Sequence, residues 1–210
     1  MSTRDAIRRV ERLREAARRQ KSRGQAIGRL PPGQVLTQKF PVLHYGAIPE
    51  IDLAKWTFEI WGLVEQTITL DWEAFNALPQ TTITADIHCV TRWSKFDTTW
   101  TGVAGKDILE LIDIQPDASH VMVHAYGGYT TNLPIEAFQD DSVIFATLYE
   151  GAPLPSEHGW PMRLVVPERY FWKSAKWCRG LEFIPHDKRG FWEMYGYHND
   201  GNPWEEERFG

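Results

Sequence analysis

Cys89 is the first residue in this chain of 210 residues whose type and position suggest chemistry. It directly follows the strand-like run TTITADIH and precedes a polar and aromatic stretch. A cysteine at a strand end is held rigidly where a loop begins, which suits a metal ligand or a nucleophile. A thiolate needs positive neighbours, and Arg92 lies three residues further on. A buried structural cysteine is the alternative for Cys89, and a salt bridge with Asp86 or Asp97 is the alternative for Arg92.

The second cysteine, Cys178, has no comparable surroundings, and we predict that it packs in the core. Two cysteines are too few for a disulfide framework. Neither has another cysteine or a histidine at the spacing of a zinc finger. A zinc-dependent hydrolase using Cys89 and nearby histidines is therefore an alternative without a paired-ligand motif to support it.

The elements that must position Cys89 are mostly short strands. Residues 71–78 begin with Asp71, a good cap residue, and predict a short helix; a second helix is predicted at 106–112. The last twenty residues are rich in glycine and aromatic residues and predict an irregular wrap. Together these signals predict one mixed α+β domain over residues 40–210. Strands are predicted at 56–61, 66–70, 81–87, 120–125, 142–148, 163–167 and 177–184, and the first two are predicted to form a hairpin.

The residues before this domain differ from it in charge. Ten of the 23 Lys and Arg residues, but only three of the 28 acids, lie in residues 1–30. Helical spacing of apolar residues over 4–22 predicts a basic helical leader at 1–24. Glycines and prolines then predict an extended linker arm at 25–39.

A basic leader is compatible with binding to nucleic acid or to a membrane. We favour a helix that lies on its own acidic body, because residues 1–30 have no aromatic side chain to stack on bases. No apolar run is long enough to span a membrane, and no secretory signal follows the arginine pairs. The expected location is therefore cytoplasmic, with no nucleic-acid partner.

Several segments resemble, in the right order, the molybdopterin-binding domain of the sulfite oxidase family. Any one segment would be weak evidence, but together they are specific, and the resemblance runs from about residue 40 to 200. The family includes the catalytic subunit of the bacterial periplasmic methionine sulfoxide reductase. The matching segments are IHCVTRWS at 87–94 with WTGV at 100–103, YGGYTTNLP at 126–134, GAPLP at 151–155 with HGWPMRLVVP at 158–167, and YFWKSAKW at 170–177.

The resemblance implies a sulfite-oxidase-type fold of mixed β-sheets that binds the molybdenum–molybdopterin cofactor. It implies that Cys89 is the thiolate ligand of the metal. A thiolate is a soft ligand and is a suitable partner for such a metal. A basic residue near the metal helps to hold an oxyanion substrate in this family, which is a second role for Arg92. The positions that match cofactor contacts are His44, Tyr45, His158, Arg163, Ser174, Ala175 and Lys176.

The implied activity is a two-electron oxygen-atom transfer on a small oxo-anion or sulfoxide-type substrate. The electrons would pass to or from a separate electron-transfer protein. A hypothesis from another class is a binding module that keeps this fold without the cofactor. Metal and pterin analysis distinguishes these hypotheses from the zinc hydrolase.

Overall fold

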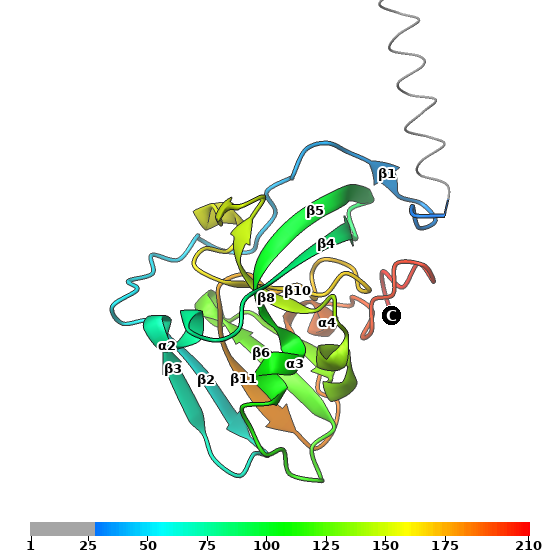
Figure 1. Ribbon diagram of the computed structural model, residues 1–210. Helices are drawn as coiled ribbons and strands as arrows, with labels where there is room; N and C mark the ends of the chain where they lie inside the picture. Colours follow the sequence, from blue (N-terminus) through cyan, green and yellow to red (C-terminus); the bar gives the residue numbers. More distant parts are fainter. Residues whose placement is uncertain (1–27) are drawn as a thin grey trace, which may run out of the picture.

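Two β-sheets form the framework of residues 28–210, the part of the chain that the computed structural model describes (Figure 1). The predicted helix at 4–22 lies outside the described residues, as does the leader at 1–24. No helix among the described residues is both long and apolar enough to cross a membrane.

The first sheet has six strands and is organised around β5, which is 12 residues long. β5 pairs with β4 and β8 in antiparallel fashion and with β1 in parallel. A side chain at Gly102 of β5 would overlap the carbonyl oxygen of Phe145, so glycine permits the close approach of β8 there. The strands are β1 (Val35–Leu36), β4 (Thr81–His88), β5 (Trp93–Ala104), β8 (Ile144–Tyr149), β9 (Ala152–Pro153) and β10 (Arg163–Val165).

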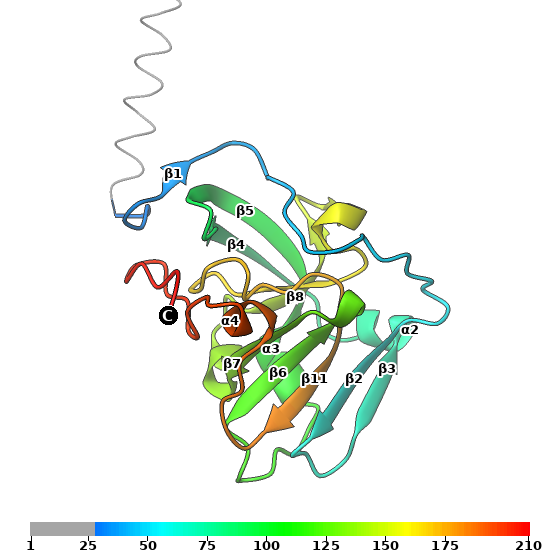
Figure 2. The same cartoon turned by 180° about the vertical axis from the view of Figure 1, so that it is seen from behind.

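The second sheet has five strands in the order β3-β2-β11-β6-β7. The predicted hairpin is confirmed, since β2 and β3 pair in antiparallel fashion. β11 lies between β2, to which it is parallel, and β6, to which it is antiparallel (Figure 2). The strands are β2 (Thr57–Gly62), β3 (Ile68–Asp71), β6 (His120–Ala125), β7 (Thr130–Pro134) and β11 (Cys178–Ile184).

The helices are short and lie at the ends of strands. The predicted cap is present, because the Asp71 carboxylate accepts a 2.8 Å hydrogen bond from the Ala74 amide. The α+β prediction is confirmed. The helices are α2 (Trp72–Asn76), α3 (Gly105–Leu109), α4 (Phe191–Met194) and the single-turn helices η1 (Tyr126–Gly128), η2 (Ile135–Gln139) and η3 (Ser156–His158).

Apolar side chains from both sheets form one large core. It includes Phe58 and Ile60 of β2, Phe145 of β8 and Leu181 of β11, all fully buried. Phe58 and Ile60 alternate with exposed residues along β2, because one face of this strand packs on the core. A smaller cluster around Trp100 lies within the first sheet.

The arm before the domain is part of the fold. β1 lies within residues 25–39 and extends the first sheet along β5. The guanidinium of Arg29 forms ion pairs of 2.6 Å with both Asp86 and Asp97. Residues 37–56 then run as an extended strap from β1 towards β2 (Figures 1 and 2).

Candidate active site

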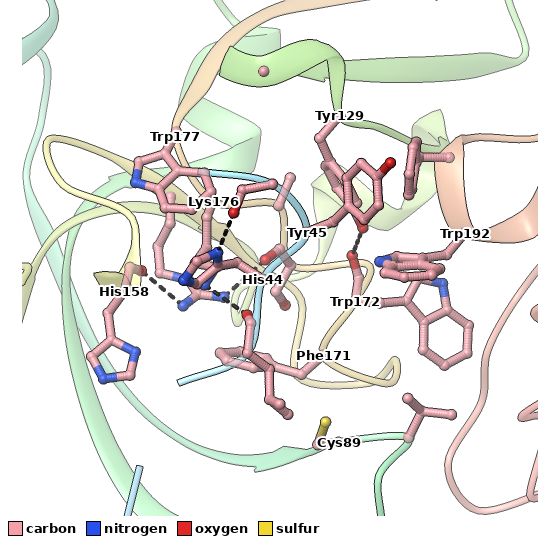
Figure 3. Close-up of a pocket in the computed structure, with 18 of the residues that line it drawn as sticks. His44, Tyr45, Cys89, Tyr129, His158, Phe171, Trp172, Lys176, Trp177 and Trp192 are labelled. Atoms are coloured by element: carbon pink, nitrogen blue, oxygen red, sulfur yellow. Dashed lines mark hydrogen bonds between the residues drawn. The ribbon is translucent and has the colours of Figure 1, made fainter. Parts of the chain in front are cut away.

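A cavity of about 630 Å³ opens beside the strap, and five segments of the chain line it, within residues 40–49, 89–93, 126–129, 158–177 and 191–197 (Figure 3). This volume lies within the range of small-molecule and cofactor sites. Eight of the nine site residues predicted from the sequence line it, and Arg92 does not. The eight are His44, Tyr45, Cys89, His158, Arg163, Ser174, Ala175 and Lys176.

Cys89 occupies a tight turn immediately after β4. Its amide donates to the Trp93 carbonyl at 2.8 Å, and the Arg92 amide donates to the Cys89 carbonyl at 3.0 Å. Arg92 takes a left-handed φ of 73° to close this turn. The strand end therefore fixes the backbone of Cys89 while its thiol faces the cavity (Figure 3).

The Cys89 thiol is 7% exposed, and burial raises its pKa. A 3.1 Å contact with the Thr91 hydroxyl opposes this shift. In the cofactor-free protein the group is therefore a protonated thiol at neutral pH. Coordination by a metal ion would displace the proton, as it does for cysteine ligands in general.

The structure places Arg92 apart from the other predicted site residues. Its side chain is exposed and lies outside the cavity lining, and its contact with a substrate stays a prediction. Neither salt bridge considered as the alternative is formed among the described residues, where Asp86 and Asp97 pair with Arg29.

A cation from the C-terminal segment, Arg208, also contacts the Cys89 turn. Its guanidinium donates a 2.8 Å hydrogen bond to the Val90 carbonyl, and its charge lowers the pKa of Cys89. Arg208 is 6% exposed. No local sequence pattern identifies it, because 118 residues separate it from Val90.

Arg163 places a fully buried guanidinium beneath the cavity. It donates to the carbonyls of His158 at 3.0 Å and Ser174 at 2.8 Å, and its charge lies 4.2 Å from the Phe171 ring centre. Among the described residues no carboxylate forms an ion pair with it. Burial accordingly lowers its pKa to about 9.

Lys176 lies directly opposite Arg163, because an antiparallel bridge pairs the two residues. Its ammonium donates to the carbonyls of Leu43 at 2.7 Å and Glu157 at 2.8 Å. Burial, together with the charge of Arg163, lowers its pKa to about 7. Gly159 has φ 117°, and a Cβ there would lie 3.0 Å from that of Arg163, so glycine allows the bridge to close.

His158 forms part of the same wall and is neutral. Its ring stacks on Phe40 with a centroid distance of 3.8 Å. Burial, and then the charges of Arg163 and Lys176, lower its pKa to about 4. It can therefore offer the cavity a neutral ring nitrogen without adding a third positive charge.

The strap carries the first two predicted residues. His44 is exposed, and its Nδ1 hydrogen-bonds the Gly46 carbonyl at 3.0 Å. Tyr45 is 64% exposed and packs against Phe191 at 4.8 Å. Their side chains reach the cavity from the strap (Figure 3).

Ser174 and Ala175 contribute mainly through their backbone. The Ser174 carbonyl accepts from Arg163, and its hydroxyl accepts a 2.9 Å hydrogen bond from the Val166 amide. The Ala175 carbonyl accepts from the Leu164 amide at 2.8 Å. The segment is therefore fixed against β10, and the two residues hold Arg163 and Lys176 in place.

The other side of the cavity is an aromatic wall, whose residues the sequence analysis did not name individually. Trp172, Trp192 and Tyr197 line it, and Trp192 and Tyr197 come from the segment predicted only as an irregular wrap. Behind this wall Lys173 and Glu193 form a buried ion pair of 2.7 Å. The Trp172 indole also donates to Glu193 at 2.9 Å. The dense run of basic and aromatic residues at 170–177 was the sequence signal that could have identified Trp172 and Lys173.

The donor set fits a large anionic cofactor with a soft metal. A thiol enters the cavity from Cys89, and within residues 28–210 the hydrogen bonds of the Arg163 and Lys176 cations all go to carbonyl oxygens. A buried charge without a counter-charge is costly, so the site favours a bound anion. No group of three or more His, Cys, Asp or Glu side chains in residues 28–210 is arranged to bind a metal, which leaves the zinc alternative without support there.

Fold and cavity together define a molybdopterin-binding oxidoreductase. The chain belongs to the family described as the oxidoreductase molybdopterin binding domain, whose profile matches residues 45–192. It is a sulfite-oxidase-like member, as the sequence segments predicted.

Three relatives place the chain within this family. An uncharacterized oxidoreductase, YuiH, of Bacillus subtilis is 45% identical over 87% of this chain and 92% of its own length. The protein-methionine-sulfoxide reductase catalytic subunit MsrP of Gluconobacter oxydans is 27% identical over 92% of this chain and 72% of its own. The sulfane dehydrogenase SoxCD of Paracoccus pantotrophus has the same fold, with a TM-score of 0.62 and 24% identity over 68% of this chain and 41% of that one.

Proposed function

We propose that this protein is a molybdenum-cofactor-dependent enzyme that transfers an oxygen atom to or from a small substrate, with Cys89 as the protein ligand of the metal. The observation that carries the proposal is the cavity that the Cys89 thiol shares with two cations that have no carboxylate partner in the part of the chain that the structure describes. When bound, the cofactor supplies a molybdenum centre that exchanges an oxygen atom and two electrons with the substrate.

The protein side chains divide this task between two ends of the cavity. Cys89 binds the metal as a thiolate, and the Thr91 hydroxyl donates to its sulfur. Arg163 and Lys176 neutralise the phosphate of the cofactor and fix its orientation. His44 and Tyr45 contact the cofactor from the strap, and His158 contacts it from η3.

A neutral sulfoxide fits the substrate end better than an oxyanion does. The charged side chains in the cavity lining are Arg163 and Lys176, and the proposal assigns both to the phosphate of the cofactor. Arg92, the residue expected to hold an oxyanion, lies outside the lining. Aromatic rings such as Trp172 and Trp192 favour contact with sulfur and methyl groups. The sulfoxide reductase activity in the name of the Gluconobacter relative agrees with this choice.

The electrons for this reaction would come from a separate redox protein, because the proposed cofactor needs two electrons for each oxygen atom that it transfers.

A cytoplasmic location stays a prediction, which fractionation of cells that express the native gene would test. A cofactor-free binding module remains the alternative from another class, and it has no observation of its own in favour.

Metal and pterin analysis tests the proposal directly. Protein purified from a host that makes molybdopterin should contain about one molybdenum and one pterin per chain. It should reduce methionine sulfoxide with a reduced viologen dye as the donor. Cys89→Ser should abolish this turnover while the protein remains folded.

Cys178→Ser is the matched control, because a serine there keeps a donor for the Ala175 carbonyl, which Cys178 contacts at 3.2 Å. It should retain turnover. Wild-type turnover in metal-loaded Cys89→Ser would overturn the ligand assignment. Oxidation of sulfite without reduction of any sulfoxide would overturn the substrate assignment alone.

A further inference from the structure

Gln34, a residue of the N-terminal arm, holds the backbone of Cys89 from behind. It is 7% exposed, and its amide nitrogen donates a 3.0 Å hydrogen bond to the Cys89 carbonyl. That carbonyl also accepts from the Arg92 amide, so both of its lone pairs are used. The carbonyl is thus fixed from two directions, one of them outside the turn itself.

The Gln34 side chain is itself held in one orientation. Its carbonyl oxygen accepts from the Ser94 hydroxyl at 3.4 Å, and that hydroxyl also bonds His88 Nδ1 at 2.8 Å. His88 and Ser94 are both buried and flank Cys89 on β4 and β5. With its oxygen engaged by Ser94, the amide must direct its nitrogen towards Cys89.

The arm and the C-terminal segment clamp the whole turn. The Val35 amide donates to the Arg92 carbonyl at 2.9 Å, next to Gln34 on the arm. Arg208 donates to the Val90 carbonyl at 2.8 Å and to the Pro32 carbonyl at 3.3 Å. One guanidinium therefore links the turn to the arm.

We propose that Gln34 is a positioning residue that fixes the direction of the Cys89 thiol towards the metal. The inference rests on the proposed function, because it takes Cys89 as the ligand. Partners of metal ligands typically change metal affinity or activity by about ten- to hundredfold when they are removed. Gln34 differs from most such partners in acting on the ligand's backbone, from 55 residues earlier in the chain.

The test compares two glutamines of the same arm in the metal-loaded enzyme. Gln34→Met keeps an unbranched side chain of similar length and removes the donor. Gln38→Met makes the same change at an exposed position and is the matched control. For each variant, molybdenum content, thermal unfolding, kcat, KM and the electron paramagnetic resonance spectrum of the one-electron-reduced metal are measured.

Gln34→Met should lower kcat by about ten- to hundredfold, with KM nearly unchanged, and should shift or broaden the resonance spectrum. Gln38→Met should match the wild type in every measurement. A folded, metal-loaded Gln34→Met enzyme with the wild-type spectrum and kcat would overturn the proposal. If Gln34→Met does not fold, Gln34→Glu replaces it, because glutamate keeps the acceptor for Ser94 and removes the donor.

Failure of the proposed function has a different signature. If the wild-type protein holds no molybdenum, the role of Gln34 is tested in the cofactor-free chain carrying Cys178→Ser. The rate at which iodoacetamide alkylates Cys89 should then rise in Gln34→Met and stay unchanged in Gln38→Met. An unchanged rate in Gln34→Met would show that Gln34 does not position the thiol.

Discussion

Arg163 and Lys176 face each other across an antiparallel bridge, and both cations bond backbone carbonyl oxygens instead of carboxylates. Each lowers the pKa of His158, and Arg163 also lowers that of Lys176. Such a pair is costly in an empty site and becomes favourable when an anion binds between or beside the charges. The pair therefore makes predictions about cofactor retention and about pH.

The first prediction concerns Lys176→Met. A hydrogen bond to a charged group is worth about 1.5–3 kcal/mol, so retention of a phosphate-bearing cofactor should fall by about ten- to hundredfold. Molybdenum and pterin content after gel filtration measures it. Lys39→Met, at an exposed lysine on the arm, is the control and should keep full content. Equal cofactor content in the two variants would contradict an anion-binding role for Lys176.

The second prediction concerns the pH dependence of stability in the cofactor-free protein. The pKa of Lys176 is lowered from 10.5 to about 7, so between these values the unfolded chain binds more protons than the folded one. The contribution of Lys176 to the free energy of unfolding must therefore rise with pH across this window. Below pH 7 Lys176 is charged in both the folded and the unfolded state, so the whole cost of burying its charge lowers the free energy of unfolding.

Urea unfolding of the wild type and of Lys176→Met at pH 6, 7.5 and 9 measures this contribution. The difference between their free energies of unfolding isolates Lys176 from the other titrating groups. The variant's stability relative to the wild type should be highest at pH 6 and should fall towards pH 9. A difference that does not change with pH would show that Lys176 keeps its ordinary pKa in the fold.

The third prediction concerns the ion pair behind the aromatic wall. Lys173 and Glu193 are 1% and 0% exposed, and removal of one member of a buried pair typically costs about 3–5 kcal/mol. Lys173→Met should therefore destabilise the fold by about that amount. Lys173→Met combined with Glu193→Gln should recover much of the loss, because no buried charge is then left alone. Urea unfolding of the four proteins of this double-mutant cycle measures the coupling; additive losses would contradict it.

Local signals explain which parts of the fold could be predicted from the sequence. The β2–β3 hairpin and the Asp71 cap depend on neighbouring residues, and both were predicted. β5 and β7 were missed. In β5, polar residues such as Asp97 interrupt the apolar alternation, and its pairing with β4 and β8 fixes the strand.

The same reasoning applies to the candidate site. Family segments indicated eight residues that the fold brings to one cavity, since each lies in or near a recognisable run. Gln34 and Arg208 carry no such signal, because they reach the Cys89 turn across 55 and 118 residues of sequence. The position of the Arg92 side chain could not be predicted for a related reason. Spacing along the chain gave its distance from Cys89 in sequence, but the left-handed turn determines where its side chain lies.

The fourth prediction separates the leader from the arm. The described contacts between the arm and the rest of the fold begin at Arg29, whose exposed ion pairs are worth about 1 kcal/mol or less. Deletion of residues 1–27 should therefore leave molybdenum content and thermal stability unchanged. Deletion of residues 1–37 also removes β1 and the buried Gln34 hydrogen bond, which alone contributes about 1 kcal/mol.

The longer deletion should thus lower both the melting temperature and the molybdenum content. Both quantities are needed, because loss of β1 alone would lower the melting temperature without a specific effect on the molybdenum content. Molybdenum content in Gln34→Met, which keeps β1, provides that comparison. If deletion of residues 1–27 lowers the molybdenum content as much as deletion of 1–37 does, residues before the arm contribute to the site, which would contradict this prediction.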